Sequence, residues 1–163
     1  MPKRPLVCDT TVLLYLERVG QADLLPLLFT PIYVPEPVML ELDMGRLLRP
    51  DTFNPRECAW IEPVAVSEGA VAALPPNRLG RGERAVVAYA YSLPGCVVGL
   101  DDLQARRLAE ELGLTVIGTL GILLRAKQAG LLPTVRPLIH ALIAQGFHLA
   151  PDLYQTVLDL AGE

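Results

Sequence analysis

Short apolar runs alternate with helical patterns along the first two thirds of the chain. Runs rich in β-branched and other apolar side chains predict strands, which we expect at residues 6–8, 32–34, 60–66, 97–100 and 115–117. Apolar positions that recur every three to four residues predict helices, which we expect at residues 12–19, 22–29, 35–44, 83–93 and 103–112. Strands that alternate with helices are typical of a parallel α/β sheet.

Prolines and glycines mark several of the predicted boundaries. Pro35 and Pro37 suit the first turn of a helix, and Gly45 suits the position just past its end. We therefore expect that helix to stop at Met44. Pro63 lies inside the third predicted strand, which favours an edge position for that strand.

The last part of the chain is helical in pattern. From Thr119 onward, apolar positions keep a helical spacing that is interrupted at Gly130, Pro133, Gly146 and Pro151. We expect one domain over residues 1–163, in which residues 118–163 form a mostly helical C-terminal part.

Glu83 heads an apolar helix face. Val86, Val87 and Ala90 follow it at i+3, i+4 and i+7, so the face should point into the core. The helix dipole favours an acid in the first turn, which explains the position of Glu83 along the axis. It does not explain why a carboxylate shares the apolar face.

Acidic residues directly follow two of the predicted strands. Asp9 follows the first strand, and Asp101 follows the fourth, with Asp102 beside it. In parallel α/β sheets, sites form outside the carboxyl ends of the strands. Glu41 lies in the helix after the second strand, and Glu83 follows a loop. We therefore expect these acids to converge on one rim.

Each acid also has a purely structural interpretation. Asp9, Asp101 and Asp102 are suited to cap the helices that follow them, although two adjacent acids exceed what one cap requires. Glu41 by itself is typical of a solvated acid on a helix. The sequence leaves these alternatives open, including whether Asp101 or Asp102 is the main ligand.

A rim of carboxylates without nearby histidine or cysteine ligands favours hard divalent cations. Carboxylates in one cleft raise one another's pKa unless cations are bound. Mg²⁺ and Mn²⁺ suit sites made of a few carboxylates, water and substrate phosphate. Two such ions, about 3.5–4 Å apart, can activate water and stabilise the leaving oxygen of a phosphodiester.

Composition and charge indicate in which compartment the protein works and which partners it can bind. The formal net charge of −4 argues against binding of nucleic acid by bulk electrostatics alone. We expect neither a membrane span nor a signal peptide. The three isolated cysteines, Cys8, Cys58 and Cys96, are typical of reduced thiols, which favours a cytoplasmic protein.

Arginines cluster near the predicted rim. Three of them lie in or just after the loop before Glu83, and a fourth lies in the helix after Asp101. We expect them to contact phosphates, although weak pairing with local acids is an alternative. They are Arg78, Arg81, Arg84 and Arg106.

Motifs along nearly the whole chain resemble those of PIN-domain proteins of the VapC-like ribonuclease superfamily, in a subfamily of unknown function. They are LVCDTTVLLYLERVG, VPEPVMLELDMG, LGRGERAVVAYA, VVGLDDLQARRLAEELGLTVIGTLGILLRAKQAGL and LYQTVLDLAGE. The resemblance implies a three-layer α/β/α sandwich with a central, mainly parallel sheet and a helical C-terminal region. It also implies a ribonuclease dependent on Mg²⁺ or Mn²⁺, often the toxin of a toxin–antitoxin pair.

The resemblance assigns roles position by position. The catalytic acids would be Asp9, Glu41, Glu83 and Asp101, and the metal ligands Asp9, Glu83, Asp101 and Asp102. Many PIN nucleases have aspartate where this chain has Glu83, and glutamate reaches one methylene further. The implied partners are RNA, an antitoxin protein and a second copy of the chain. The alternative is a catalytically weak or inactive PIN-fold module that binds RNA or a protein partner.

Overall fold

Five short strands form one sheet in the computed structural model, which describes residues 2–163. Their order across the sheet is β3-β2-β1-β4-β5, and every neighbouring pair is parallel. The strands are β1 (Leu6–Cys8), β2 (Ile32–Pro35), β3 (Ile61–Val64), β4 (Val97–Gly99) and β5 (Thr115–Ile117). The predicted parallel sheet is confirmed, and β3 lies at an edge, as Pro63 predicts.

The chain changes direction across the sheet at β1. It first adds β2 and β3 on one side of β1, and later places β4 and β5 on the other side. Cys8 at the end of β1 is therefore paired with Gly99 at the end of β4. Such a switch point leaves a crevice at the carboxyl ends of the two strands, where open α/β sheets bind their ligands.

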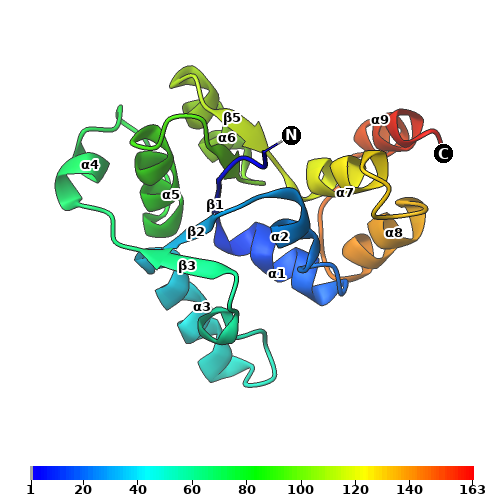
Figure 1. Ribbon diagram of the computed structural model, residues 1–163, viewed down its shortest axis with the longest axis horizontal. Helices are drawn as coiled ribbons and strands as arrows, with labels where there is room; N and C mark the ends of the chain where they lie inside the picture. Colours follow the sequence, from blue (N-terminus) through cyan, green and yellow to red (C-terminus); the bar gives the residue numbers. More distant parts are fainter. Residues whose placement is uncertain (1) are drawn as a thin grey trace.

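Helices cover both faces of the sheet. The connections move across the sheet in one direction as far as β3 and in the other direction afterwards. Because connections between parallel strands are right-handed almost without exception, α1 and α2 lie on one face and α5 and α6 on the other, which makes a three-layer α/β/α sandwich. Figure 1 shows α7, α8 and α9 at the end of the molecule farthest from α4 and α5. The helices are α1 (Thr10–Arg18), α2 (Leu24–Leu28), α3 (Glu36–Leu48), α4 (Glu68–Ala72), α5 (Arg81–Tyr91), α6 (Leu103–Glu111), α7 (Thr119–Gln128), α8 (Arg136–Ala144) and α9 (Pro151–Ala161).

The apolar face predicted behind Glu83 is part of the core. Val86 and Val87 are fully buried and Ala90 is nearly so, on the side of α5 that packs against β1, β2 and β4. Their burial fixes the rotation of α5 about its axis. The first turn of this helix is thereby held at the rim of the sheet.

The structure corrects the predicted end of one helix. α3 does not stop at Met44 but continues through Gly45 to Leu48. A Cβ at residue 45 would meet no atom within 4 Å, and the helix continues past this glycine. Its only effect is to make the helix less stable than alanine would, by about 1 kcal/mol. The short helix α4, capped by the Ser67 side chain, lies in a segment for which the sequence predicted no helix.

None of the helices in the described part of the chain, residues 2–163, is long and apolar enough to cross a membrane.

Candidate functional site

Asp9 lies directly after β1 and is 4% exposed. It occupies the N-cap position of α1, yet its side chain makes no capping hydrogen bond. Its Oδ1 atom is buried and has no hydrogen-bond partner. Burial raises the pKa of Asp9 to about 7, and the charges of Glu83, Glu41 and Asp101 act in the same direction. The capping interpretation therefore does not account for this side chain.

Glu41 bridges three helices. Its Oε2 accepts a hydrogen bond of 2.7 Å from the Thr10 hydroxyl in α1. Its Oε1 accepts one of 3.2 Å from the backbone N–H of Gly82 in the first turn of α5. Glu41 is therefore anchored on the rim rather than free in solvent.

Gly82 is the residue that lets α5 approach Glu41. A Cβ atom at this position would lie 2.9 Å from Cδ of Glu41, closer than real Cβ contacts allow. The glycine therefore exposes its N–H to the carboxylate. Glycine at residue 82 is thus part of the site, although the sequence suggested only a loop there.

Asp101 and Asp102 have different environments. Asp101 Oδ1 accepts a hydrogen bond of 2.8 Å from the Thr119 N–H, and its Oδ2 accepts one of 2.6 Å from the Thr119 hydroxyl. Asp102 Oδ2 accepts a 2.9 Å bond from the Ala105 N–H and caps α6. The cap therefore belongs to Asp102, and Asp101 is held at the mouth of the switch point.

Burial also raises the pKa of two further acids. For Asp101 burial outweighs the opposing effect of the Thr119 hydrogen bonds and of the Arg106 charge. For Glu83 burial is the largest cause, followed by the charge of Asp102. Glu41 adds to the shift of Glu83 as well. The acids therefore lie close enough together for Glu83, Glu41 and Asp101 to raise the pKa of Asp9.

The carboxylates of the rim, in the positions that they have among residues 2–163, do not converge on one common point as the ligands of a bound metal ion do. Among residues 2–163, no group of three or more His, Cys, Asp or Glu side chains is placed to hold a metal ion in common. The chemistry of the rim nevertheless fits Mg²⁺ or Mn²⁺, because its donors are carboxylate oxygens. The buried Asp9 Oδ1 has an unmet requirement for a positive partner, which a cation would satisfy.

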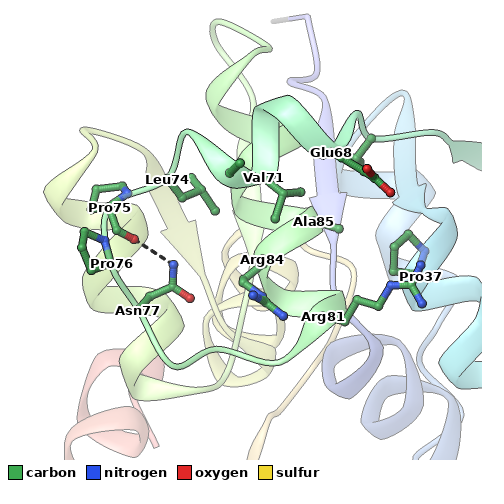
Figure 2. A pocket seen from close by; sticks show the side chains of 12 residues that line it. Pro37, Glu68, Val71, Leu74, Pro75, Pro76, Asn77, Arg81, Arg84 and Ala85 are labelled. Atoms are coloured by element: carbon green, nitrogen blue, oxygen red, sulfur yellow. Dashed lines mark hydrogen bonds between the residues drawn. The ribbon is translucent and has the colours of Figure 1, made fainter.

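The four predicted phosphate-binding arginines lie in different settings. Arg106 donates a 2.9 Å hydrogen bond from Nη1 to the Leu100 carbonyl, which holds it beside Asp101. Arg78 is exposed in the loop before α5. Arg81 and Arg84 line a hollow of about 500 Å³ at the start of α5 (Figure 2). The structure thus separates Arg106 from the pair on α5.

Two positioning threonines were not predicted. Thr10 and Thr119 hold Glu41 and Asp101, respectively, and Thr119 is fully buried. Both belong to stretches that carry the family resemblance: Asp-Thr-Thr lies in LVCDTTVLLYLERVG, and Gly-Thr-Leu-Gly lies in VVGLDDLQARRLAEELGLTVIGTLGILLRAKQAGL. A hydroxyl one residue after a strand-end acid or strand-end glycine is the signal that identifies them.

Comparison with known protein families gives a match over nearly the whole chain. A family model described as DUF3368: PIN domain matches residues 5–163. No curated protein matches the chain. The match covers nearly all of the chain, including every strand of the sheet and all the acids of the rim. The chain therefore belongs to the PIN-domain family.

Proposed function

We propose that this chain is an endoribonuclease dependent on Mg²⁺ or Mn²⁺. PIN domains have a nuclease-type fold, typically use divalent metals and act on RNA. The observation that carries the proposal for this chain is the buried, unpartnered Oδ1 of Asp9 at the switch point. Glu41, Glu83 and Asp101 surround it closely enough to raise its pKa.

The roles of the acids follow from their surroundings. Asp9, Glu83 and Asp101 would hold the ions, together with the Asp102 oxygen that does not cap α6. Bound ions of this kind supply an activated water and charge stabilisation for a phosphodiester leaving group. Glu41, the fourth acid that the family resemblance assigns to catalysis, takes a positioning role in this proposal, because its carboxylate holds Thr10 and the first turn of α5 around the site.

The arginines supply the contacts to the RNA backbone. We assign phosphate contacts to Arg78 in the loop before α5, to Arg81 and Arg84 on α5, and to Arg106 on α6. Local positive charge of this kind compensates for the net charge of −4. The chain would thus bind RNA through a small basic surface rather than through its overall charge.

The wider biological role is also part of the proposal. We infer that the chain is a single cytoplasmic domain that acts as the toxin of a toxin–antitoxin pair, as a homodimer. Apolar side chains of the C-terminal helices that remain partly exposed, such as Ile143 at 44%, are available to a second copy or to an antitoxin helix.

The first experiment is Mn²⁺ binding by calorimetry. The wild type is compared with the double variant Asp9→Asn/Asp101→Asn, and far-UV circular dichroism confirms that both are folded. Saturable binding that disappears in the variant supports the metal site. Cleavage of single-stranded and structured RNA is then measured for the wild type and for Glu83→Gln, and full activity in Glu83→Gln would refute the role of Glu83.

A second candidate function is a PIN-fold module that binds RNA or a protein without cutting. The observation in its favour is that Glu41 and Asp101 are already engaged in hydrogen bonds and that no three acids in residues 2–163 share a metal position. Absence of Mn²⁺ binding at millimolar concentration, with RNA binding retained, would select this candidate.

A further inference from the structure

A hollow of about 500 Å³ lies beside the rim, between the start of α3, α4 with the loop after it, and the start of α5. Figure 2 shows the two arginines of α5 on one side of it and the apolar side chains of the loop on the other. Its apolar lining includes Pro37, Val71, Leu74, Pro75, Pro76 and Ala85. A volume of this size suits a small organic group rather than a large protein segment.

The loop that forms one wall of the hollow is stabilised by hydrogen bonds within the loop itself. The Asn77 side chain donates a 2.8 Å hydrogen bond to the Pro75 carbonyl, and its Oδ1 accepts a 3.1 Å bond from the Leu79 N–H. The ring of Pro76 between them restricts the backbone further. The wall is therefore shaped before any ligand arrives, which lowers the entropic cost of binding.

The opposite side of the hollow carries the positively charged side chains of Arg81 and Arg84. No ion pair within residues 2–163 includes Arg81 or Arg84. The Nε atom of Arg84 is buried and has no hydrogen-bond partner. A buried donor without a partner is costly, and an anionic ligand would remove that cost.

We propose that this hollow binds one nucleotide of the RNA strand, with its phosphate at Arg81 and Arg84 and its base against the wall of Leu74 and Pro76. This subsite rests on the proposed ribonuclease function and names a specificity element for it. Guanidinium groups bind phosphate oxygens in a bidentate manner, and apolar side chains pack against the face of a base. A lone acidic side chain would leave that wall uncovered, so a nucleotide fits better than an acidic peptide.

The hollow and the rim share two helices. Pro37 at the hollow and Glu41 at the rim are one turn apart on the same side of α3. Arg84 at the hollow and Glu83 at the rim are neighbours on α5. An RNA strand with one nucleotide in the hollow would therefore bring a nearby phosphodiester of the same strand to the carboxylates of the rim.

The test measures binding without metal, so that cleavage does not interfere. The probe is a fluorescent 2′-O-methyl uridine hexanucleotide, titrated in EDTA and followed by anisotropy, and a second probe is an abasic hexamer of the same charge. We expect Arg84→Gln and Arg81→Gln each to weaken the affinity for both probes about tenfold. Each variant should also lower the slope of log affinity against log salt concentration by about one. Leu74→Ser should weaken the uridine probe alone, because only that probe has bases.

Two control variants sharpen the result. Lys3→Gln removes one charge just before β1, at the amino ends of the strands and thus away from the rim. This variant should change the affinity for the hexamers less than twofold. Glu68, the acid in the lining, repels phosphate, so Glu68→Gln should tighten binding of both probes. Thermal melting checks the fold of each variant, and the exposed Arg81 provides a variant that does not disturb buried atoms.

Two results would overturn the subsite. One is unchanged hexamer affinity in both folded arginine variants. The other is tighter, Arg84-dependent binding of a hexaglutamate peptide, which would assign the hollow to a protein partner. Failure of the ribonuclease proposal looks different, because Arg84-dependent hexamer binding would then persist without any metal-dependent cleavage.

Discussion

The carboxylate of Glu41 on α3 accepts a hydrogen bond from the backbone N–H of Gly82, 3.2 Å away in the first turn of α5. This contact joins residues 41 positions apart and exists because residue 82 has no side chain. It ties the helix that carries Glu83 to the helix that carries Glu41. The geometry of the rim therefore depends on a glycine that has no chemistry of its own.

Gly82→Ala tests that dependence. The new Cβ would displace the Glu41 carboxylate, which is the flexible end of a side chain, so we expect the free energy of unfolding to fall by no more than about 1 kcal/mol. The rate of RNA cleavage should fall about tenfold or more, because the acids on α3 and α5 lose their positions relative to one another. Gly69→Ala, in the first turn of α4 with open space around it, is the matched control and should keep full activity. Wild-type activity in Gly82→Ala would show that the contact is dispensable.

Asp9 makes the metal-free protein sensitive to pH. Its pKa is about 7 in the folded chain and near 3.8 when unfolded, so the folded state holds its proton more tightly. The contribution of Asp9 to stability is then greatest below about pH 4 and is lost as the pH rises toward 7, because ionisation of this side chain favours the unfolded chain. We expect Asp9→Asn to be more stable than the wild type by about 2–4 kcal/mol at pH 8 in EDTA.

Urea unfolding at pH 5 and pH 8 measures this difference. The gain from Asp9→Asn should be smaller at pH 5 than at pH 8. Asp102→Asn serves as the control, since that exposed side chain caps α6 and is not buried. An Asp9→Asn protein that is less stable than the wild type at pH 8 would contradict the assignment of an unpartnered buried charge.

Thr119 is expected to position Asp101 rather than to take part in chemistry. Thr119→Val removes the 2.6 Å hydroxyl bond and leaves the 2.8 Å bond from the backbone N–H. We expect a loss of about 1–2 kcal/mol in stability and about tenfold in cleavage. Thr119→Ser keeps the hydroxyl and should retain most activity. Equal cleavage rates for the valine and serine variants would remove Thr119 from the site.

Gly45 lies inside α3, where a better helix former should help. Because the position is exposed and a Cβ meets nothing within 4 Å, Gly45→Ala should raise the free energy of unfolding by about 0.5–1 kcal/mol. Guanidinium chloride unfolding provides the measurement, and activity should not change. A destabilised variant would mean that the helix does not continue past Met44.

Sequence reasoning reached the architecture because strands and helices here obey simple periodicities. The strand ends also indicated the site, because Asp9 directly follows β1 and Asp101 lies two residues after the end of the neighbouring strand β4. The end of α3 was predicted wrongly because one glycine costs a helix only about 1 kcal/mol, which packing and the remaining turns offset. α4 was missed because five residues are too few to show a periodicity.

The partners of the acids were beyond the reach of the sequence. Whether Asp101 or Asp102 caps α6 depends on which carboxylate meets the Ala105 N–H, and both are chemically able to do so. Glu41 resembled any solvated acid until the folded chain brought Thr10 and Gly82 to it. Contacts between distant segments determine these roles, and local patterns do not encode them.

The strand order has a consequence for the growing chain. β1 lies between β2, which follows it closely in the sequence, and β4, which is made almost ninety residues later. Asp101 and its anchor Thr119 come later still. A ribosome-bound fragment that ends before residue 101 carries at most Asp9, Glu41 and Glu83, and it lacks both Asp101 and the threonine that positions it. On the proposed function, the chain cannot cut the messenger RNA from which it is being translated until most of its own synthesis is complete.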